Sequence, residues 1–319
     1  MDKCPGFSHL IVIPRLQVQN ANAISSPHTH GFPSMTAFLG LMWALERKTA
    51  ARGLDLQFNA IGVVVHKHQE LSTKGGFLKT FRLTRNPIQR DGKTSAIVEE
   101  GRIHLDLSLV LAVQSDSLEI ANETTKREIA GIVKDITTHQ RIAGGSVVPS
   151  SASRWKQTPY VSLAEDFERV KMRLLPGFVM VERQDLLDSR YQSMVECRPA
   201  ASRLEAWLSL SSVNWNWREE ADGTSGFWEH DRTGLGWLVP IPLGYAALTE
   251  VQAPGTVTNA RDEEVPFCFV ESIFGIGQWL SPHRINRVEE MLWYADSRPE
   301  NGLYGCGNDY SVGPTFDFN

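Results

Sequence analysis

The chain has 319 residues, a formal net charge of −5 and 42% hydrophobic residues, enough apolar material for one large folded domain or two modest ones. The mildly acidic balance argues against a protein that coats nucleic acid with its whole surface, but it permits a local basic groove. No apolar run reaches the roughly 20 residues that a membrane span needs, and the four scattered cysteines form no C-x-x-C pair. We expect a cytoplasmic protein with reduced thiols, no membrane contact, no cofactor and no metal.

The first half of the chain predicts an antiparallel sheet with helices on one face. Apolar runs predict strands at residues 10–13, 54–65, 77–83 and 103–113. A helix is expected from an N-cap at Ser34 to about residue 48, and a second helix carries an apolar stripe. The members of that stripe are Ile129, Ile132, Val133 and Ile136. This order of elements is typical of α+β folds of the RNA-recognition type.

The second half predicts a further lobe behind a polar linker at residues 149–159. Helices are expected around residues 163–174 and 200–211, strands at 236–241 and 265–270, and an acidic loop at 219–232. A last helix is expected to open at Ser281-Pro282. We therefore divide the chain into a domain at 1–148, a C-terminal lobe at 160–298 and a tail at 299–319 that is expected to be poorly ordered.

A polar segment follows the first predicted strand, where the strand is expected to run out into a turn. Its residues are Arg15, Gln17, Gln19, Asn20 and Asn22. Amides and guanidinium groups bind base edges and phosphates but do little covalent chemistry. The segment therefore indicates a nucleic-acid contact. The alternative is that these side chains only cap the local backbone.

Residues 67–93 carry more positive charge than the rest of this acidic protein. The cations are Lys67, Lys74, Lys79, Arg82, Arg85, Arg90 and Lys93, and the anions are Glu70 and Asp91. Such a concentration is the footprint of a phosphate contact. Phe77 and Phe81 lie among the cations and could stack on bases, which is worth about 1–3 kcal/mol per base. The alternative is a solvated hairpin that is simply charged.

A third segment holds Arg141, Gly144, Gly145 and Ser146. Two glycines after a helix can present amide N–H groups to a phosphate, with the Arg and Ser side chains assisting. The spacing is not that of a P-loop. The alternative is an ordinary helix C-cap that leads into a strand.

Two histidine pairs, His28/His30 and His66/His68, raise two alternatives to simple RNA binding. These alternatives are metal binding and acid–base cleavage of RNA. Neither pair has a Cys, Asp or Glu at ligand spacing, so we expect no metal. RNA cleavage by His28 or His30 stays open as the enzyme alternative. The sequence has no G-x-S-x-G, H-E-x-x-H or paired-carboxylate motif that would indicate a hydrolase.

Thirteen blocks in one order along the chain resemble the family of the second Csy protein, the Cas-five-type subunit of type I-F CRISPR surveillance complexes. The blocks are residues 15–16, 19–27, 31–34, 83–87, 90–92, 96–102, 143–146, 173–178, 236–242, 259–262, 269–271, 277–284 and 292–294. The resemblance implies a ferredoxin-like, RNA-recognition-type domain, with a β-rich insertion, or thumb, at about residues 67–102 and a further C-terminal lobe.

The resemblance also implies a non-catalytic subunit that holds the 5′ handle of the CRISPR RNA. It would pair with the large subunit near the protospacer-adjacent DNA and contact a backbone subunit. Target double-stranded DNA and the hairpin-bound endonuclease would be indirect partners. Some Cas-five-type relatives cut their own guide precursor, but the resemblance is to a branch in which a separate subunit makes that cut.

Together these signals predict RNA-binding residues and no catalytic residue. The RNA-binding residues are Arg15, Gln19, Asn20, Asn22, Arg85, Asn86, Arg90, Arg141, Gly144, Gly145 and Ser146. Contacts with RNA, DNA or a neighbouring subunit are expected at Lys93, Arg102, Arg261 and Arg284. Two alternatives stay open: a metal-independent endoribonuclease that processes guide precursor, and a scaffold that contacts only protein.

Overall fold

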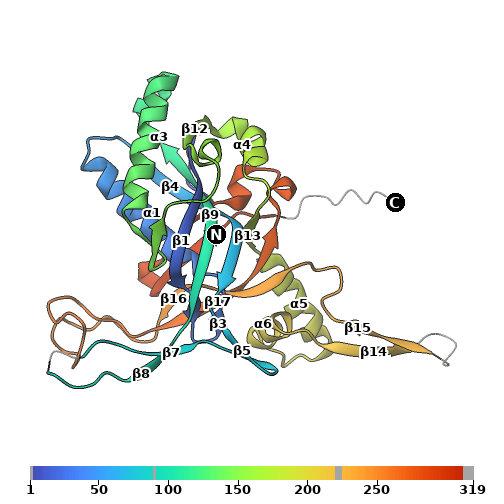
Figure 1. Cartoon of the computed structure of the whole chain (residues 1–319). Coiled ribbons are helices and arrows are strands. Elements are labelled where there is room, and N and C mark those ends of the chain that lie inside the picture. The colour runs from blue at the N-terminus through green and yellow to red at the C-terminus, as the bar shows by residue number, and fades with distance from the viewer. Residues whose placement is uncertain (1–2, 89–90, 220–224, 312–319) are drawn as a thin grey trace.

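A large antiparallel sheet forms the centre of the molecule (Figure 1). The computed structural model describes residues 3–88, 91–219 and 225–311, and this part of the chain has a mixed α/β architecture. In spatial order the strands are β10 (Arg141–Ile142), β11 (Gly145–Val148), β1 (His9–Asn22), β9 (Arg102–Gln114), β4 (Gln57–Glu70), β13 (Phe178–Glu182), β17 (Val270–Leu280), β16 (Leu238–Ala247), β19 (Leu303–Asn308) and β18 (Trp293–Ala295). Strand β12 (Tyr160–Leu163) pairs with the first residues of β1, and β18 also pairs with β4.

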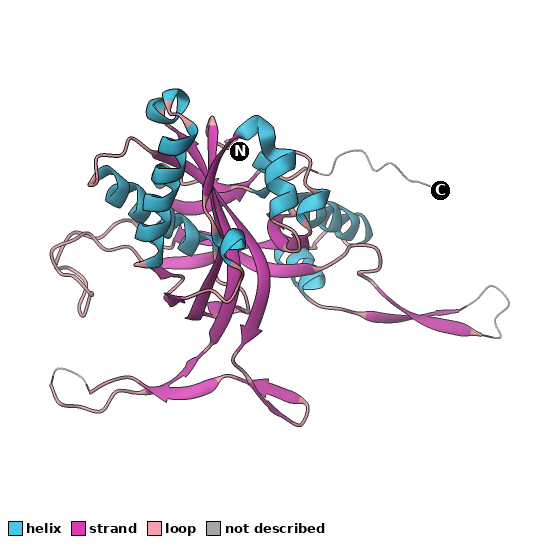
Figure 2. Cartoon of the chain, turned by 45° about the horizontal axis from the view of Figure 1, so that its top comes forward, coloured by secondary structure: helices cyan, strands magenta, loops and turns pink. Residues whose placement is uncertain are grey.

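The N-terminal half contributes the strand order β11-β1-β9-β4, and all three pairings are antiparallel. Helix α1 (Met35–Ala50) connects β1 to β4, and α3 (Glu123–Thr138) connects β9 to the β10–β11 hairpin. Both helices pack on the same face of the sheet, where residues such as Phe38 and Val133 join the main hydrophobic core (Figure 2). The expected Ser34 cap of α1 is confirmed, because its hydroxyl accepts from the Thr36 N–H.

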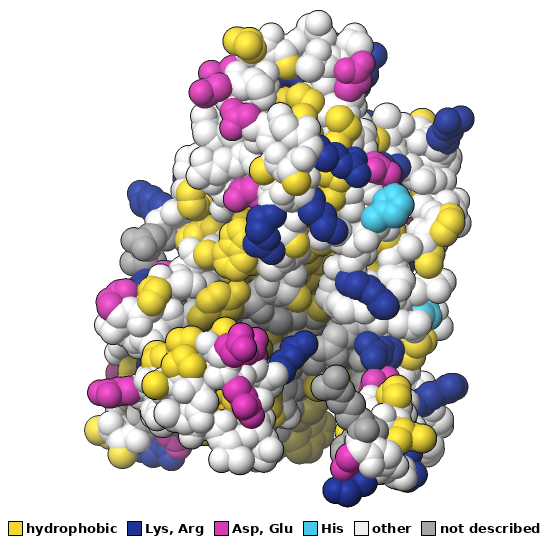
Figure 3. Space-filling model, turned by 90° about the vertical axis from the view of Figure 1, so that its left-hand side faces the viewer, with side chains coloured by type: hydrophobic (Ala, Val, Ile, Leu, Met, Phe, Trp, Pro, Cys, Tyr) yellow, Lys and Arg dark blue, Asp and Glu magenta, His cyan; other side chains and the backbone are white. Residues whose placement is uncertain are grey.

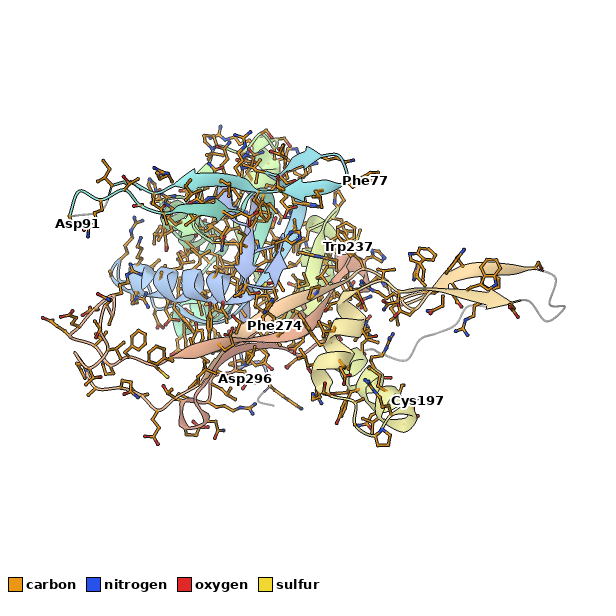
Figure 4. The ribbon with its side chains drawn as sticks, turned by 90° about the horizontal axis from the view of Figure 1, so that it is seen from below. Phe77, Asp91, Cys197, Trp237, Phe274 and Asp296 are labelled. Atoms are coloured by element: carbon orange, nitrogen blue, oxygen red, sulfur yellow. The ribbon has the colours of Figure 1, made fainter. Side chains whose placement is uncertain are left out.

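The thumb grows out of the far ends of β4 and β9 and divides into two arms. One arm is the hairpin of β5 (Thr73–Gly75) and β6 (Leu78–Thr80), and the other is the ribbon of β7 (Arg82–Arg85) and β8 (Ile97–Glu100). Phe77 lies on the first arm and Asp91 near the tip of the second, and the arms point in opposite directions (Figure 4). The single strand expected at residues 77–83 is therefore two short strands on different arms.

The C-terminal half extends the same sheet beyond β4, through strands β13, β17, β16, β19 and β18.

The remaining helices and strands of the described chain come from both halves. They are α2 (Asp116–Ile120), α4 (Phe167–Arg173), α5 (Gln184–Cys197), α6 (Arg203–Ser211), β2 (Ile24–Ser26), β3 (Thr29–His30), β14 (Trp215–Glu219) and β15 (Gly226–His230). Short 3-10 turns are η1 (Arg154–Gln157), η2 (Ala164–Asp166), η3 (Pro282–Arg284), η4 (Val288–Met291) and η5 (Pro299–Asn301). Helix α4 covers one end of the sheet face opposite α1 and α3, over a second core that includes Val12, Val110 and Leu174.

Several expectations for the second half are wrong. The predicted last helix is only the turns η3 and η4, because Ile285 and Arg287 between them adopt extended backbone. Of the predicted loop at residues 219–232, residues 220–224 lie outside the described residues, and the rest contains β15 and the end of β14, which pair as an antiparallel hairpin. Helix α5 was not predicted. Residues 303–308, inside the expected tail, form β19, whose Cys306 is buried in the main core.

Within the described residues, no helix is both long and apolar enough to cross a bilayer. All four cysteines are free, and Cys306 is the most deeply buried of them.

Candidate nucleic-acid interface

The polar segment after residue 13 is part of strand β1 and does not form the expected turn. Strand β1 continues to Asn22, with register shifts against β9 after Ile13 and after Val18. Arg15 and Asn20 adopt positive φ angles of 56° and 57° at these two bulges. Each bulge adds a residue to one strand only, which re-aligns the alternation of the side chains that follow.

The two bulges separate apolar from polar side chains. Leu16, Val18 and Ala21 all stay in the core beneath α1 and α3. Gln17 and Asn22 consequently lie on the opposite face of the sheet. A regular strand could not bury this sequence on one side, because its apolar residues do not keep a period of two.

Polar side chains of three neighbouring strands share the sheet face opposite α1 and α3. Directly paired residues lie on the same face of a sheet. The pairs are Gln17 with Asp106, Asp106 with Lys67, Asn22 with Arg102, and His104 with Gln69. We call this surface the polar sheet face. It continues the area that α4 covers at the other end of the strands.

The glycine-containing segment forms a hairpin that packs against the end of β1. Its two-residue turn consists of Ala143 and Gly144, with φ angles of 46° and 79°, which is the conformation that tight hairpins favour. Ser146 pairs with Gln19, and the Asn22 N–H donates to the Ala143 carbonyl over 2.8 Å. This turn therefore belongs to a strand hairpin and not to a helix C-cap.

Gly145 permits the close approach of this hairpin to β1. A Cβ atom at Gly145 would lie 2.7 Å from Val18 Cγ1, 2.8 Å from the Ala21 nitrogen and 2.8 Å from the Gln19 carbonyl oxygen. Two of these neighbours are backbone atoms that cannot move aside independently. Glycine is therefore required at this position by space, whatever the role of the hairpin in binding.

Asn20 connects the hairpin side of β1 to β9. Its backbone N–H donates to His104 Nδ1 over 3.1 Å, and its carbonyl accepts from Arg102 Nη1 over 3.4 Å. The side chains of Gln19 and Asn20 are exposed. In contrast, the Asn22 amide bonds both the N–H and the carbonyl of Ile24, at 3.2 and 2.7 Å. For Asn22 the structure therefore shows the local capping role that the sequence left open.

Arg15 is not part of this exposed group. Its side chain is only 14% exposed, and its guanidinium lies 3.7 Å from Asp106. Its backbone N–H donates to Ser108 Oγ, which lies 2.7 Å from His66 Nε2, while His66 Nδ1 lies 2.7 Å from the Pro176 carbonyl. Burial lowers the pKa of His66, so the neutral ring donates to the carbonyl and accepts from the serine. These groups brace the sheet where β1, β9 and β4 meet.

An open pocket of about 600 Å³ adjoins the hairpin. Its lining includes Asn22, Arg141 and Gly144, residues of α1, and Tyr245 and Tyr304. Arg141 Nη1 donates to the Gly144 carbonyl over 3.2 Å, so the guanidinium lies against its own turn. On the side of the molecule shown in Figure 3, Lys and Arg side chains gather near the middle, above a hollow between two projecting segments.

The predicted thumb and C-terminal residues lie apart from this group. Arg85 and Asn86 are exposed on the thumb arm that carries Asp91. Lys93 forms an ion pair with Asp91 over 3.0 Å. Arg90 lies outside the described residues. Arg261 and Arg284 are exposed, in the connection before β17 and in η3 respectively.

One histidine has a carboxylate partner that sequence spacing did not reveal. His30 Nδ1 lies 2.9 Å from Glu70 Oε1, and the two residues are 40 positions apart. The His28 ring packs 5.8 Å from that of Phe274. Among residues 3–88, 91–219 and 225–311, no three His, Cys, Asp or Glu side chains come close enough to hold a metal ion.

The sequence interpretation missed the β9 contribution to this interface, namely His104 and Asp106, and also Gln69 on β4. The signal was present, because polar residues alternate with Ile and Leu from Arg102 to Ser108. That alternation predicts one polar face of a strand. It became informative only when the pairing with β1 was known.

Comparison with known proteins identifies the class of protein that carries this interface. Residues 11–306 match the family described as CRISPR-associated protein (Cas_Csy2), which covers most of the chain. The chain is also 42% identical over 312 residues to the CRISPR-associated protein Csy2 of Pseudomonas aeruginosa (strain UCBPP-PA14), covering 92% of this chain and 94% of that protein. This chain therefore belongs to the Csy2 family, which confirms the resemblance to the second Csy protein of type I-F systems.

Proposed function

We propose that this chain is a non-catalytic RNA-binding subunit of a type I-F surveillance complex in the cytoplasm and that it holds the 5′ handle of the CRISPR RNA. The observation that carries the proposal is the contiguity of three segments from separate parts of the sequence. The exposed amides of β1, the cation Arg102 on β9 and the β10–β11 hairpin form one surface. Family membership supports the CRISPR role.

The strand order supports an RNA-recognition-type domain. The order β11-β1-β9-β4, with α1 and α3 on one face, is the order of a ferredoxin-like βαββαβ unit. RNA-recognition domains bind single-stranded RNA on the sheet face that their helices leave free. The polar sheet face occupies that position here, and Gln69, His104 and Arg102 supply amide, imidazole and guanidinium groups.

The chemistry of these groups suits unpaired RNA. Arg102 and Arg141 supply charge to phosphates, which sets affinity. Gln19 and Asn20 can donate to and accept from base edges, which sets a preference among sequences. The thumb cations would extend the contact along the guide toward a backbone subunit. The large subunit would pair with this chain beside the protospacer-adjacent DNA.

A salt titration of RNA binding tests the proposal. The Arg102→Ala/Arg141→Ala variant should bind handle RNA at least tenfold more weakly than the wild type, with a shallower dependence of log Kd on log salt. Each lost phosphate contact reduces that slope by about 0.7 for a single strand. A matched control is Arg203→Ala, which removes an exposed cation that pairs with Asp188 on α5.

Unchanged affinity and slope in the double variant would contradict the proposed interface. Salt-independent retention of the chain by its large partner, with no RNA binding, would favour the scaffold alternative. Measurements on the assembled complex should therefore record RNA content and subunit content together.

The His30–Glu70 pair favours one second candidate, a metal-independent endoribonuclease. An imidazole beside a carboxylate can accept and return a proton, and this His is 67% exposed. Incubation of the purified chain with repeat RNA in EDTA tests this function. A specific cut that disappears in His30→Ala or His28→Ala would establish it, whereas intact RNA in the wild-type reaction would exclude it.

A further inference from the structure

We propose that the β14–β15 hairpin docks onto another protein subunit of the complex. Its tryptophan face would bind in an apolar groove of that subunit, and Lys and Arg side chains would form the rim of the groove. The inference rests on the proposed function insofar as the chain works in a multi-subunit assembly. It concerns a surface that the RNA interface does not use.

The hairpin projects from the body of the molecule beyond α5 and α6 (Figures 1 and 4). Its strands, Trp215–Glu219 and Gly226–His230, pair with each other and with no other strand of the described chain. An isolated two-stranded hairpin is marginally stable in water, because no further strand or helix packs against it. A projection of this kind therefore gains stability when another surface covers it.

Three tryptophans lie on one face of the hairpin. Trp217 pairs directly with Trp228, and Trp215 with His230, so their side chains share a face. The Trp217 and Trp228 rings pack at 5.6 Å and 69°, and the Trp215 and His230 rings at 5.0 Å and 88°. The three indoles nevertheless remain 58%, 50% and 61% exposed for Trp215, Trp217 and Trp228. Tryptophan is mostly buried in folded proteins, so this face lacks its cover.

The opposite face of the hairpin is suited to water. Asn216 pairs with Glu229 and Arg218 with Phe227, so Phe227 is its one aromatic residue. Arg218 Nε lies 3.4 Å from Glu229 Oε2. The strand alternation therefore directs apolar surface to a single side, as expected for an element that docks by one face.

Further exposed apolar side chains occur in and just after α6, next to the start of the hairpin. Leu204 and Leu208 lie one turn apart on α6, and Val213 lies between α6 and β14; they are 63%, 50% and 50% exposed. Monomeric proteins rarely expose contiguous apolar patches beyond a few hundred Å². A surface with aromatic residues at its centre is typical of a protein interface.

Charge decides between protein and nucleic acid as the occupant. The sequence from Trp215 to Arg232 is acidic, because its carboxylates outnumber its two cations, Arg218 and Arg232. The carboxylates are Glu219, Glu220, Asp222, Glu229 and Asp231. Phosphates would be repelled here, although indoles can stack on bases. An apolar groove with a basic rim matches both the aromatic centre and the acidic surroundings.

The base of the hairpin is held in one orientation. The Asn214 N–H and Nδ2 donate to the two Asp231 carboxylate oxygens over 3.1 and 2.9 Å. Arg190 of α5 lies 3.7 Å from the same carboxylate and donates to the Asp231 carbonyl. A pre-oriented element loses less conformational freedom when it docks, which favours affinity.

The test uses the complex assembled by co-expression of all subunits with a guide. In the Trp217→Ala/Trp228→Ala variant, one subunit should dissociate from the assembly at least tenfold more readily, measured by native mass spectrometry across a dilution series. The matched control Asn216→Ala/Arg218→Ala changes the opposite face and should retain every subunit. Iodide should quench the hairpin tryptophans in the isolated chain but not in the assembly.

Two variants of opposite charge at Trp215 separate a specific effect on docking from a general loss of folding. If the groove has a basic rim, Trp215→Arg should weaken assembly more than Trp215→Glu, whereas nucleic acid on this face would give the reverse order. Retention of all subunits by the double variant, or concentration-dependent dimerisation of the chain through this face, would overturn the inference. If handle RNA still binds in that case, the proposed function stands without the docking element.

Discussion

The Asn22 N–H donates to the Ala143 carbonyl over 2.8 Å, which ties the end of strand β1 to the turn of the β10–β11 hairpin. The two residues are separated by more than one hundred positions in the chain, yet each belongs to a segment that the sequence predicts to bind RNA. This bond makes the two segments one surface. Changes in the hairpin should therefore affect the position of the β1 amides.

Gly145→Ala should destabilise the protein and weaken RNA binding together. The added methyl would overlap backbone atoms of Gln19 and Ala21, and overpacking of this kind costs about 1–3 kcal/mol. Thermal unfolding and RNA titration would measure both effects. Gly144→Ala is the matched control: its φ of 79° disfavours alanine, but no atom lies within 4 Å of the added Cβ. A Gly145→Ala variant as stable as the wild type would contradict the close packing.

Arg15→Ala should lower stability and leave RNA affinity nearly unchanged. Its guanidinium and the Asp106 carboxylate are 14% and 13% exposed, so removal of one partner leaves a poorly solvated charge. We expect a loss of about 1–3 kcal/mol in the free energy of unfolding. A double-mutant cycle with Asp106→Ala, measured by denaturant unfolding, would give the coupling between the pair. A large fall in RNA affinity at unchanged stability would instead return Arg15 to the binding site.

Arg85→Ala combined with Arg90→Ala should weaken handle binding while the thermal midpoint stays close to that of the wild type. Arg85 is exposed on β7, and removal of exposed cations rarely changes stability by more than about 0.5 kcal/mol. Fluorescence anisotropy with handle RNA and a thermal scan on the same samples would separate the two effects. A lower midpoint with normal RNA binding would show that the thumb arginines are structural.

The free energy of unfolding should fall as pH rises, because the buried carboxyl of Glu182 must lose its proton in the folded protein. Burial, with a smaller contribution from the nearby Asp296 charge, raises the pKa of Glu182 to about 7. Between the unfolded value of about 4.3 and this folded value, the folded state holds a proton that the unfolded state has released. Stability is therefore full below the unfolded pKa and falls as pH rises toward about 7. The total effect is of the order of 3 kcal/mol.

Glu182→Gln should remove most of this pH dependence and stabilise the protein at pH 8. Denaturant unfolding of both forms at pH 5 and pH 8 would measure the difference. Equal slopes with pH for the two proteins would show that another group is responsible. Glu165→Gln, which changes an exposed carboxyl in η2, is the control.

The sequence predicted the N-terminal elements well because they follow local rules. Helix α1 begins at a serine cap, and the apolar runs of β4 and β9 are long enough to dominate their neighbours. The C-terminal elements were harder to predict. Ile285, Val288 and Leu292 have helical spacing but are buried by tertiary packing in 3-10 and extended backbone.

The candidate site was predicted in its residue types more than in its arrangement. The amides at Gln19 and Asn20 and the glycines at positions 144 and 145 could be identified from the local sequence, but the hairpin that contains these glycines could not. The burial of Arg15 could not, because it depends on Asp106, a residue on another strand. The His30–Glu70 contact was likewise hidden, because its two members lie 40 positions apart in the sequence.

Strand β18 meets β4 through Trp293 and Ile61, and the Trp293 indole donates to the Met180 carbonyl over 2.8 Å. Within the described residues, the strands that pair with this edge of β4 are β13, through Phe178 and Val179, and β18, through Trp293. During synthesis on the ribosome, β4 emerges long before these segments. The nascent chain therefore carries an uncovered strand edge at Val64 and Val65 until β13 has been translated, and at Ile61 until Trp293 has been translated, which exposes it to pairing with other chains. Early termination before Trp293 should accordingly yield aggregated protein, not a usable fragment.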